Sequence, residues 1–235
     1  MSWVGDGLRA DAAPGQLDDS SPTGPTGSRR LAGRAATAGL PFLIGVLIGL
    51  VAIGLVDVAQ RPPPRILPAP IHDSVLIVPI GDMAVDRLAG LVADYRTEYG
   101  LTVTVADPLP LAPAAFDPAR GQYIAQGLIE SMWAAHPEER ASQRVVIGIT
   151  SADIYIRDVS WKWAFALRQA GRLAVISTAR MIPSRAISRD RLMRTMLTRE
   201  IGFLCYGLPP TDNPRDILYR DILGLDDLRR LNDRL

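Results

Sequence analysis

The chain has 235 residues, of which 48% are hydrophobic and 22% are charged, so it is long and apolar enough to bury a sizeable core. A formal net charge of +1 and an aromatic content of only 6% argue against nucleic acid as the partner. The lone cysteine, Cys205, excludes an internal disulfide and any zinc site built mainly from thiolates.

The first 34 residues are predicted to form a disordered tail. Between positions 11 and 28 they are mostly Pro, Gly, Ser, Asp and Thr and offer little apolar surface to bury. We therefore expect no packed structure before the apolar segment that follows.

The most distinctive segment is a run of 22 uncharged residues, 35–56. A helix of that length rises roughly 33 Å, which is enough to cross the hydrocarbon core of a bilayer, so we predict a transmembrane helix over residues 35–58. A buried core helix is the weaker alternative, because uncharged runs this long are rare in soluble cores. A cleaved signal peptide is also disfavoured, because 34 residues precede the run and Asp57 occupies the −3 position before Ala59.

Basic residues flank the predicted span on both sides. Arg29, Arg30 and Arg34 precede it, and Arg61 and Arg65 follow it. The small excess on the amino side favours a cytoplasmic N-terminus and a C-terminal domain outside the cell membrane.

Residues 59–72 are rich in proline and are predicted to be a stiff linker, and residues 73–235 are predicted to form one domain. Short apolar runs predict strands, and longer stretches with apolar residues every three or four positions predict helices. The expected strands are 75–78, 101–105, 145–149 and 172–177, and the expected helices are 84–99, 117–133, 189–206 and 226–232. Strands that alternate with helices predict an α/β (α+β) fold with a mixed sheet covered by helices.

The helix expected over residues 189–206 carries a carboxylate on its apolar side. At about 100° per residue, Glu200 lies in the middle of a stripe of Met, Leu, Ile and Phe side chains. A buried carboxylate is costly unless it is paired or protonated. Glu200 is therefore either a structural residue paired with an arginine or backbone donors, or a general base held in a cleft.

Two tryptophans, Trp161 and Trp163, flank Lys162. In a strand, alternation would put both rings on one side of the sheet. They are expected either to pack over the core or to form a surface that contacts a ligand.

Five segments of the domain resemble the archaemetzincins, a family of metzincin-type zinc metallopeptidases. They are Val-Pro-Ile-Gly at 78–81, Leu-Pro-Leu at 109–111, Arg-Gly-Gln-Tyr at 120–123, and the stretches 146–155 and 173–181. The resemblance implies a metzincin-like sheet. It also implies that 173–181 is the edge strand along which a peptide lies, with Val175 and Ser177 as ligand contacts.

The resemblance fails at the zinc site. The family carries the pattern H-E-x-x-H-x-x-G-x-x-H, in which two histidines one helical turn apart and a third after a glycine bind zinc. In this chain Arg199, Phe203 and Pro209 stand at the three histidine positions, and only Glu200 matches the general base. Gly207 follows one position late.

The remaining residues do not supply another metal or nucleophile site. The chain has two histidines, His72 and His136, whose positions suggest no pair, and a guanidinium at Arg199 would repel a dication. Leu218 takes the place of the methionine in the segment that resembles the Met-turn. Catalysis by Ser/His/Asp or Cys/His needs a histidine beside the nucleophile, so Cys205 is expected to be a packed residue. We therefore expect no cofactor.

The sequence predicts a membrane-tethered archaemetzincin-like domain without zinc, a pseudo-peptidase that binds a peptide or protein. Two alternatives stay open. One is a peptidase or hydrolase that uses Glu200 in a non-standard site, and the other is a scaffold for membrane proteins. The partners expected are the lipid bilayer and a peptide or protein, with no nucleic acid.

Overall fold

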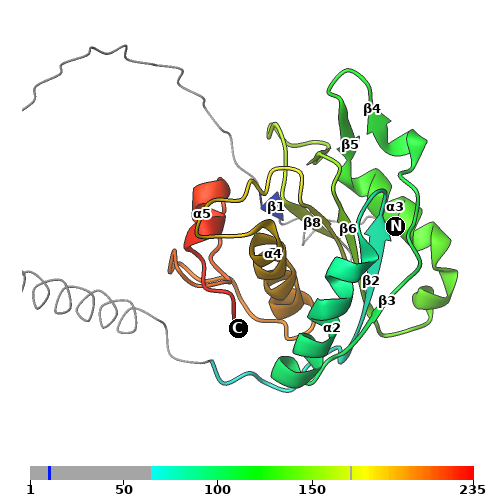
Figure 1. Cartoon of the computed structure of the whole chain (residues 1–235). Helices are drawn as coiled ribbons and strands as arrows, with labels where there is room; N and C mark the ends of the chain where they lie inside the picture. The colour runs from blue at the N-terminus through cyan, green and yellow to red at the C-terminus, as the bar shows by residue number, and fades with distance from the viewer. Residues whose placement is uncertain (1–9, 12–64, 170) are drawn as a thin grey trace, which may run out of the picture. The chain divides into compact units, whose positions relative to one another are not determined.

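The computed structural model describes residues 10–11, 65–169 and 171–235 (Figure 1). The predicted transmembrane helix, most of the predicted tail and residues 59–64 of the predicted linker lie outside these ranges. No helix among the described residues is long and apolar enough to cross a membrane. The described residues from Arg65 to Leu235 belong to one compact unit.

A mixed sheet of six strands forms the centre of this unit, in the order β1-β8-β9-β6-β2-β3. Four of its strands, β3, β2, β6 and β9, are mutually parallel, whereas β8 is antiparallel to β9 and β1 is antiparallel to β8. The strands are β1 (Ala10–Asp11), β2 (Ser74–Ile80), β3 (Thr102–Val105), β6 (Val145–Thr150), β8 (Ala166–Gln169) and β9 (Leu173–Ser177). The tail predicted to lack structure therefore contributes a two-residue strand.

Helices cover both faces of the sheet (Figure 1). On one face lie α2 (Val85–Tyr99), α4 (Arg189–Leu204) and α5 (Leu225–Arg230), and on the other lies α3 (Ala125–Ala135). The strand β2 explains the two cores, because successive side chains point to opposite faces. Val75 and Ile77 pack in the cluster with α2 and α4, and Leu76 and Val78 pack in the cluster with α3. The mixed α/β fold predicted from the sequence is confirmed.

A second sheet contradicts the helix predicted over 117–133. It contains β4 (Phe116–Asp117), β5 (Gln122–Ile124) and β7 (Ile154–Tyr155), and the helix begins only at Ala125. Asp117 Oδ1 accepts the backbone N–H groups of Ala119 at 2.9 Å and Arg120 at 3.3 Å. The carboxylate thus closes a turn, an alternative to capping a helix that aspartate also favours.

The prediction that residues 173–181 form an edge strand is wrong. The strand β9 in this segment pairs with β6 on one side and with β8 on the other. The strand β8, which was not among the predicted strands, separates β9 from the edge.

Candidate functional site

The helix α4 positions the residues that the family pattern singles out. Ser188 caps it, because its hydroxyl accepts the backbone N–H of Arg191 at 3.1 Å, and Asp190 in the first turn complements the helix dipole. Its apolar side chains pack against the sheet beside α2. Glu200 and Arg199 are therefore carried into the interior, with exposed fractions of 0% and 1%.

Glu200 has an arginine partner from the sheet. Nη1 of Arg168 lies 3.1 Å from both carboxylate oxygens, and only 11% of the Arg168 side chain is exposed. Arg168 reaches α4 because Ala166, two residues earlier on β8, faces the same helix-covered side of the sheet. The guanidinium of Arg168 also lies 4.0 Å from the centre of the Phe203 ring, a distance typical of a cation–π contact.

The guanidinium of Arg199 also lies near this ring, 4.9 Å from the ring centre of Phe203. Its Nη1 donates to the carbonyl oxygen of Ile217 at 3.0 Å. Arg199 thereby connects α4 to the segment that follows it. We name Arg168, Arg199, Glu200 and Phe203 the guanidinium cluster.

Pro209, at the third position of the family pattern, is exposed in the loop after α4. Before it, Gly207 has φ +61, a conformation that favours glycine, and a Cβ there would lie 2.7 Å from Ile71 Cδ1. Leu218 is fully buried, and a Cβ on Gly202 would lie 2.8 Å from its Cδ2. These residues shape the chain after α4, and none of their side chains carries an atom that could bind a metal ion.

Neither histidine belongs to this cluster. His72 precedes β2, and His136 follows α3, where its Nδ1 lies 3.2 Å from Glu138. Within the described residues no group of three His, Cys, Asp or Glu side chains is placed to hold a metal ion. Cys205 is fully buried, as expected, and burial raises the pKa of its thiol to about 12, which disfavours a nucleophilic thiolate.

The two tryptophans do not lie on the same side of the sheet, in contrast to the prediction for a strand. Trp161 packs against the core cluster that contains α3, and Trp163 packs against the cluster that contains α4. The alternation rule fails because residues 161–163 do not belong to a strand. Trp163 makes an edge contact with Phe165 at 4.8 Å, and the guanidinium of Arg180 lies 5.7 Å from its ring centre.

Sequence reasoning missed a polar network that fixes the segment around Trp161. Arg120 donates to the carbonyl oxygens of Trp161 and Lys162 and lies 3.9 Å from the ring centre of Tyr155. The Tyr155 hydroxyl donates to Asp117 at 2.8 Å and holds the pKa of that carboxyl below its usual value. The signal in the sequence was Asp117 followed by Arg120, but it gives no partner until the fold is known.

The outer edge of β8 pairs with the two-residue strand β1. The backbone N–H of Ser177 donates to the carbonyl oxygen of Phe165 at 2.8 Å. By antiparallel alternation, the backbone groups of Ala166 and Arg168 therefore point away from β9, toward β1. The predicted ligand contacts Val175 and Ser177 lie on β9 with fully buried side chains.

Solved structures define the class of fold. The archaemetzincin from Archaeoglobus fulgidus complexed with malonate has a TM-score of 0.56 and 17% identity, over 69% of this chain and 94% of that chain. The archaemetzincin from Methanopyrus kandleri has a TM-score of 0.54 and 22% identity, over 70% and 89% of the two chains. A zinc-dependent peptidase from Methanocorpusculum labreanum has a TM-score of 0.53 and 18% identity, over 67% and 94%. The domain has the archaemetzincin fold.

Sequence relatives identify the family. The archaemetzincin of Haloquadratum walsbyi is 32% identical over 152 residues, which cover 60% of this chain and 83% of that protein. The archaemetzincin of Natronomonas pharaonis is 30% identical over the same shares of the two chains. No protein-family model matches the chain. The chain belongs to the archaemetzincin family.

Proposed function

We propose that this protein is a membrane-anchored archaemetzincin-like domain that holds no catalytic zinc and binds an extended peptide or protein segment along β8. The observation that carries the proposal is the guanidinium cluster. In it, a carboxylate at the position of the family's general base is paired with an arginine whose guanidinium packs against a phenyl ring.

The side chains in this cluster do not fit zinc. A zinc site needs several neutral imidazoles or anionic thiolates and carboxylates, whereas this cluster offers one carboxylate, Glu200, beside two guanidinium groups and an aromatic ring. The positive charge that faces Glu200 comes from the side chain of Arg168 on β8, and no metal ion is needed to supply it. Glu200 is also fully buried, which argues against the alternative in which it acts as a general base on a peptide.

The first test is the metal content of the full chain purified in detergent after incubation with zinc. We expect about 0.1 zinc ion or less per chain, because the cluster offers one donor group, the Glu200 carboxylate, and Arg168 already pairs with it. We also expect no peptide cleavage by the native chain or by its matched variant Glu200→Gln. Stoichiometric zinc, or a cleavage activity that Glu200→Gln removes, would overturn the proposal in favour of an enzyme.

The outer edge of β8 supports binding by strand addition. The backbone groups of Ala166 and Arg168 point outward from this edge, where β1 pairs in the structure, and a strand from another molecule would take the place of β1. The pairing with β1, in which Asp11 lies opposite Ala166 and Ala10 opposite Leu167, supports an antiparallel orientation for that strand.

A peptide with the sequence of residues 6–15 tests this edge on a chain that lacks residues 1–34. We expect weak, millimolar binding, because so short a strand is marginal alone. N-methylation at Asp11 is expected to weaken it about tenfold or more, because that N–H faces Ala166. N-methylation at Ala10, whose N–H faces away from β8, is the matched control and should change affinity by less than about twofold. NMR titration measures both, and equal effects would contradict strand addition.

The membrane anchor and the β1–β8 pairing within one chain exclude each other. A span over residues 35–58 would place residue 11 and residue 65 on opposite sides of the bilayer. We propose that residues 35–58 do span the membrane, because 22 uncharged residues are hard to bury in a domain of this size. In the anchored chain the edge of β8 is then open to a strand from another molecule. The proposed orientation has the N-terminus in the cytoplasm and the domain outside.

A further inference from the structure

The residues that precede β2 are docked onto the domain. Arg65 pairs with Asp216 at 2.8 Å, with side-chain exposed fractions of 27% and 13%. The backbone N–H groups of Ile71 and His72 donate to the carbonyl oxygen of Cys205 at 2.7 and 3.2 Å. Leu67 packs against the core cluster that contains α4. The predicted stiff linker is therefore part of the domain from Arg65 onward.

This docked segment builds an uncharged surface together with the loop after α4. Residues 66–72 and 206–211 contain no Asp, Glu, Lys or Arg. The two segments lie side by side, since a Cβ on Gly207 would meet Ile71 at 2.7 Å. Ile66 is 96% exposed and Ile71 is 67% exposed. Pro68, Ala69, Gly207 and Pro209 are exposed beside them.

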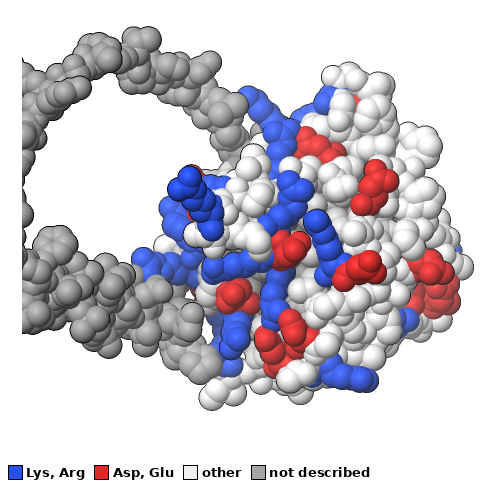
Figure 2. Space-filling model, viewed as in Figure 1, with Lys and Arg blue, Asp and Glu red and all other residues white. Residues whose placement is uncertain are grey.

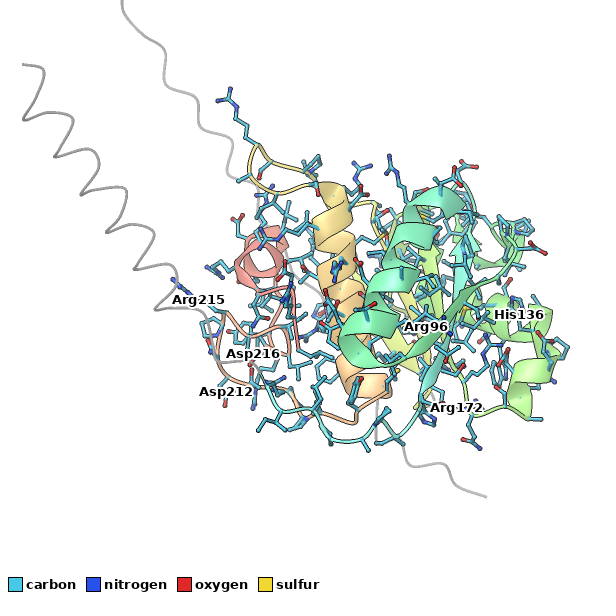
Figure 3. All side chains as sticks on the ribbon, turned by 60° about the horizontal axis from the view of Figure 1, so that its bottom comes forward. Arg96, His136, Arg172, Asp212, Arg215 and Asp216 are labelled. Atoms are coloured by element: carbon cyan, nitrogen blue, oxygen red, sulfur yellow. The ribbon has the colours of Figure 1, made fainter. Side chains whose placement is uncertain are left out.

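Charged residues lie at the border of this surface and not within it. Figure 3 shows Arg215, Asp216 and Asp212 together at one side of the domain. Asp216 pairs with Arg65, and Asp212 pairs with Arg220 at 2.7 Å. Elsewhere, the face of the domain in Figure 2 carries acidic and basic side chains intermixed. An uncharged patch with two largely exposed isoleucines is therefore unlike its surroundings and needs a partner.

The length of the intervening chain identifies that partner. Six residues, 59–64, separate the proposed span from Arg65. At about 3.3–3.6 Å per residue they reach at most about 25 Å, so the domain surface around Arg65 stays close to the bilayer. We propose that residues 66–72 and 206–211 form the membrane-facing surface of the domain, with Ile66 and Ile71 inserted among the lipid head groups. This inference rests on the proposed anchor.

The test uses the full chain in phosphatidylcholine vesicles, with a polarity-sensitive fluorophore on a single introduced cysteine. The variants are Ile66→Cys and Ile71→Cys, and the control is Val159→Cys. Val159 is also exposed, but it follows the opposite, carboxyl end of the parallel strands. The native Cys205 is buried and stays unlabelled.

We expect blue-shifted emission at positions 66 and 71, quenched by lipids that carry a nitroxide in the upper acyl chain, and neither effect at position 159. Blue-shifted emission without quenching would overturn the lipid contact in favour of a protein partner or a second copy. If emission at positions 66 and 71 resembled that at position 159, the proposed membrane-facing surface would be wrong, and the proposed membrane anchor would be unaffected. Release of the chain by alkaline carbonate would overturn the anchor itself, and the inference with it.

Discussion

Replacing Arg168 with methionine is expected to lower the free energy of unfolding of residues 65–235 by about 3–5 kcal/mol, the cost typical of breaking a buried ion pair. Glu200 is fully buried, and both of its carboxylate oxygens lie 3.1 Å from Nη1 of Arg168. Without that guanidinium the carboxylate loses a buried countercharge and cannot recover it from water. Urea denaturation followed by circular dichroism measures the change.

Two variants separate the loss of the pair from a general effect of removing an arginine. In Arg168→Met combined with Glu200→Met, apolar side chains replace both partners, and more than half of the lost stability is expected to return. Arg191→Met makes the same chemical change at an exposed pair, 3.8 Å from Asp233, and should cost less than about 1 kcal/mol. If Arg168→Met cost no more than Arg191→Met, the guanidinium of Arg168 would not be the countercharge of Glu200.

A chain that carries Asp11→Cys and Ala166→Cys is expected to form an intramolecular disulfide only when residues 35–58 are deleted. The two positions are paired on β1 and β8, and the Cα atoms of such pairs lie about 5.5 Å apart, within the range that a disulfide bridges. In the full chain the proposed span would hold the two cysteines on opposite sides of the bilayer. Mild oxidation of membranes, followed by mass spectrometry of non-reduced peptides, gives the result.

The native thiol does not interfere with this measurement, because Cys205 is buried and its pKa is raised to about 12. The single variants Asp11→Cys and Ala166→Cys are the controls for disulfides between chains. An 11–166 disulfide within the full, membrane-inserted chain would contradict the proposed span. Failure of the deleted chain to cross-link would instead contradict the pairing of β1 with β8.

Local pattern was enough to predict the parallel part of the sheet and its long helices. The runs at 75–78 and 145–149 are apolar at every position because β2 and β6 are covered on both faces. The helix predicted over 189–206 appears as α4, since apolar periodicity is a property of neighbouring residues. The ordered segments shared with the archaemetzincins were also visible in the sequence alone.

Some local sequence patterns are compatible with two different structures, and only the tertiary contacts determine which one forms. Asp117 before Pro118 is compatible with a helix cap or a turn, and the bonds to Ala119 and Tyr155 make it a turn. Residues 173–177 read as a strand in either case. Only the pairing with β8 makes that strand an inner one.

The sequence by itself determined that Glu200 lies on the apolar face of a helix, and that Arg199, Phe203 and Pro209 occupy the three positions that are histidines in the family pattern. It did not identify Arg168 as the partner of Glu200, 32 residues away along the chain. That pairing depends on β8 placing Arg168 on the face of the sheet that α4 covers, which is a property of strand register and not of any local pattern. The fold likewise decided the docking of residues 65–72. The groups that hold this segment are Asp216 and the carbonyl of Cys205, which come from the C-terminal part of the sequence and lie far from it along the chain.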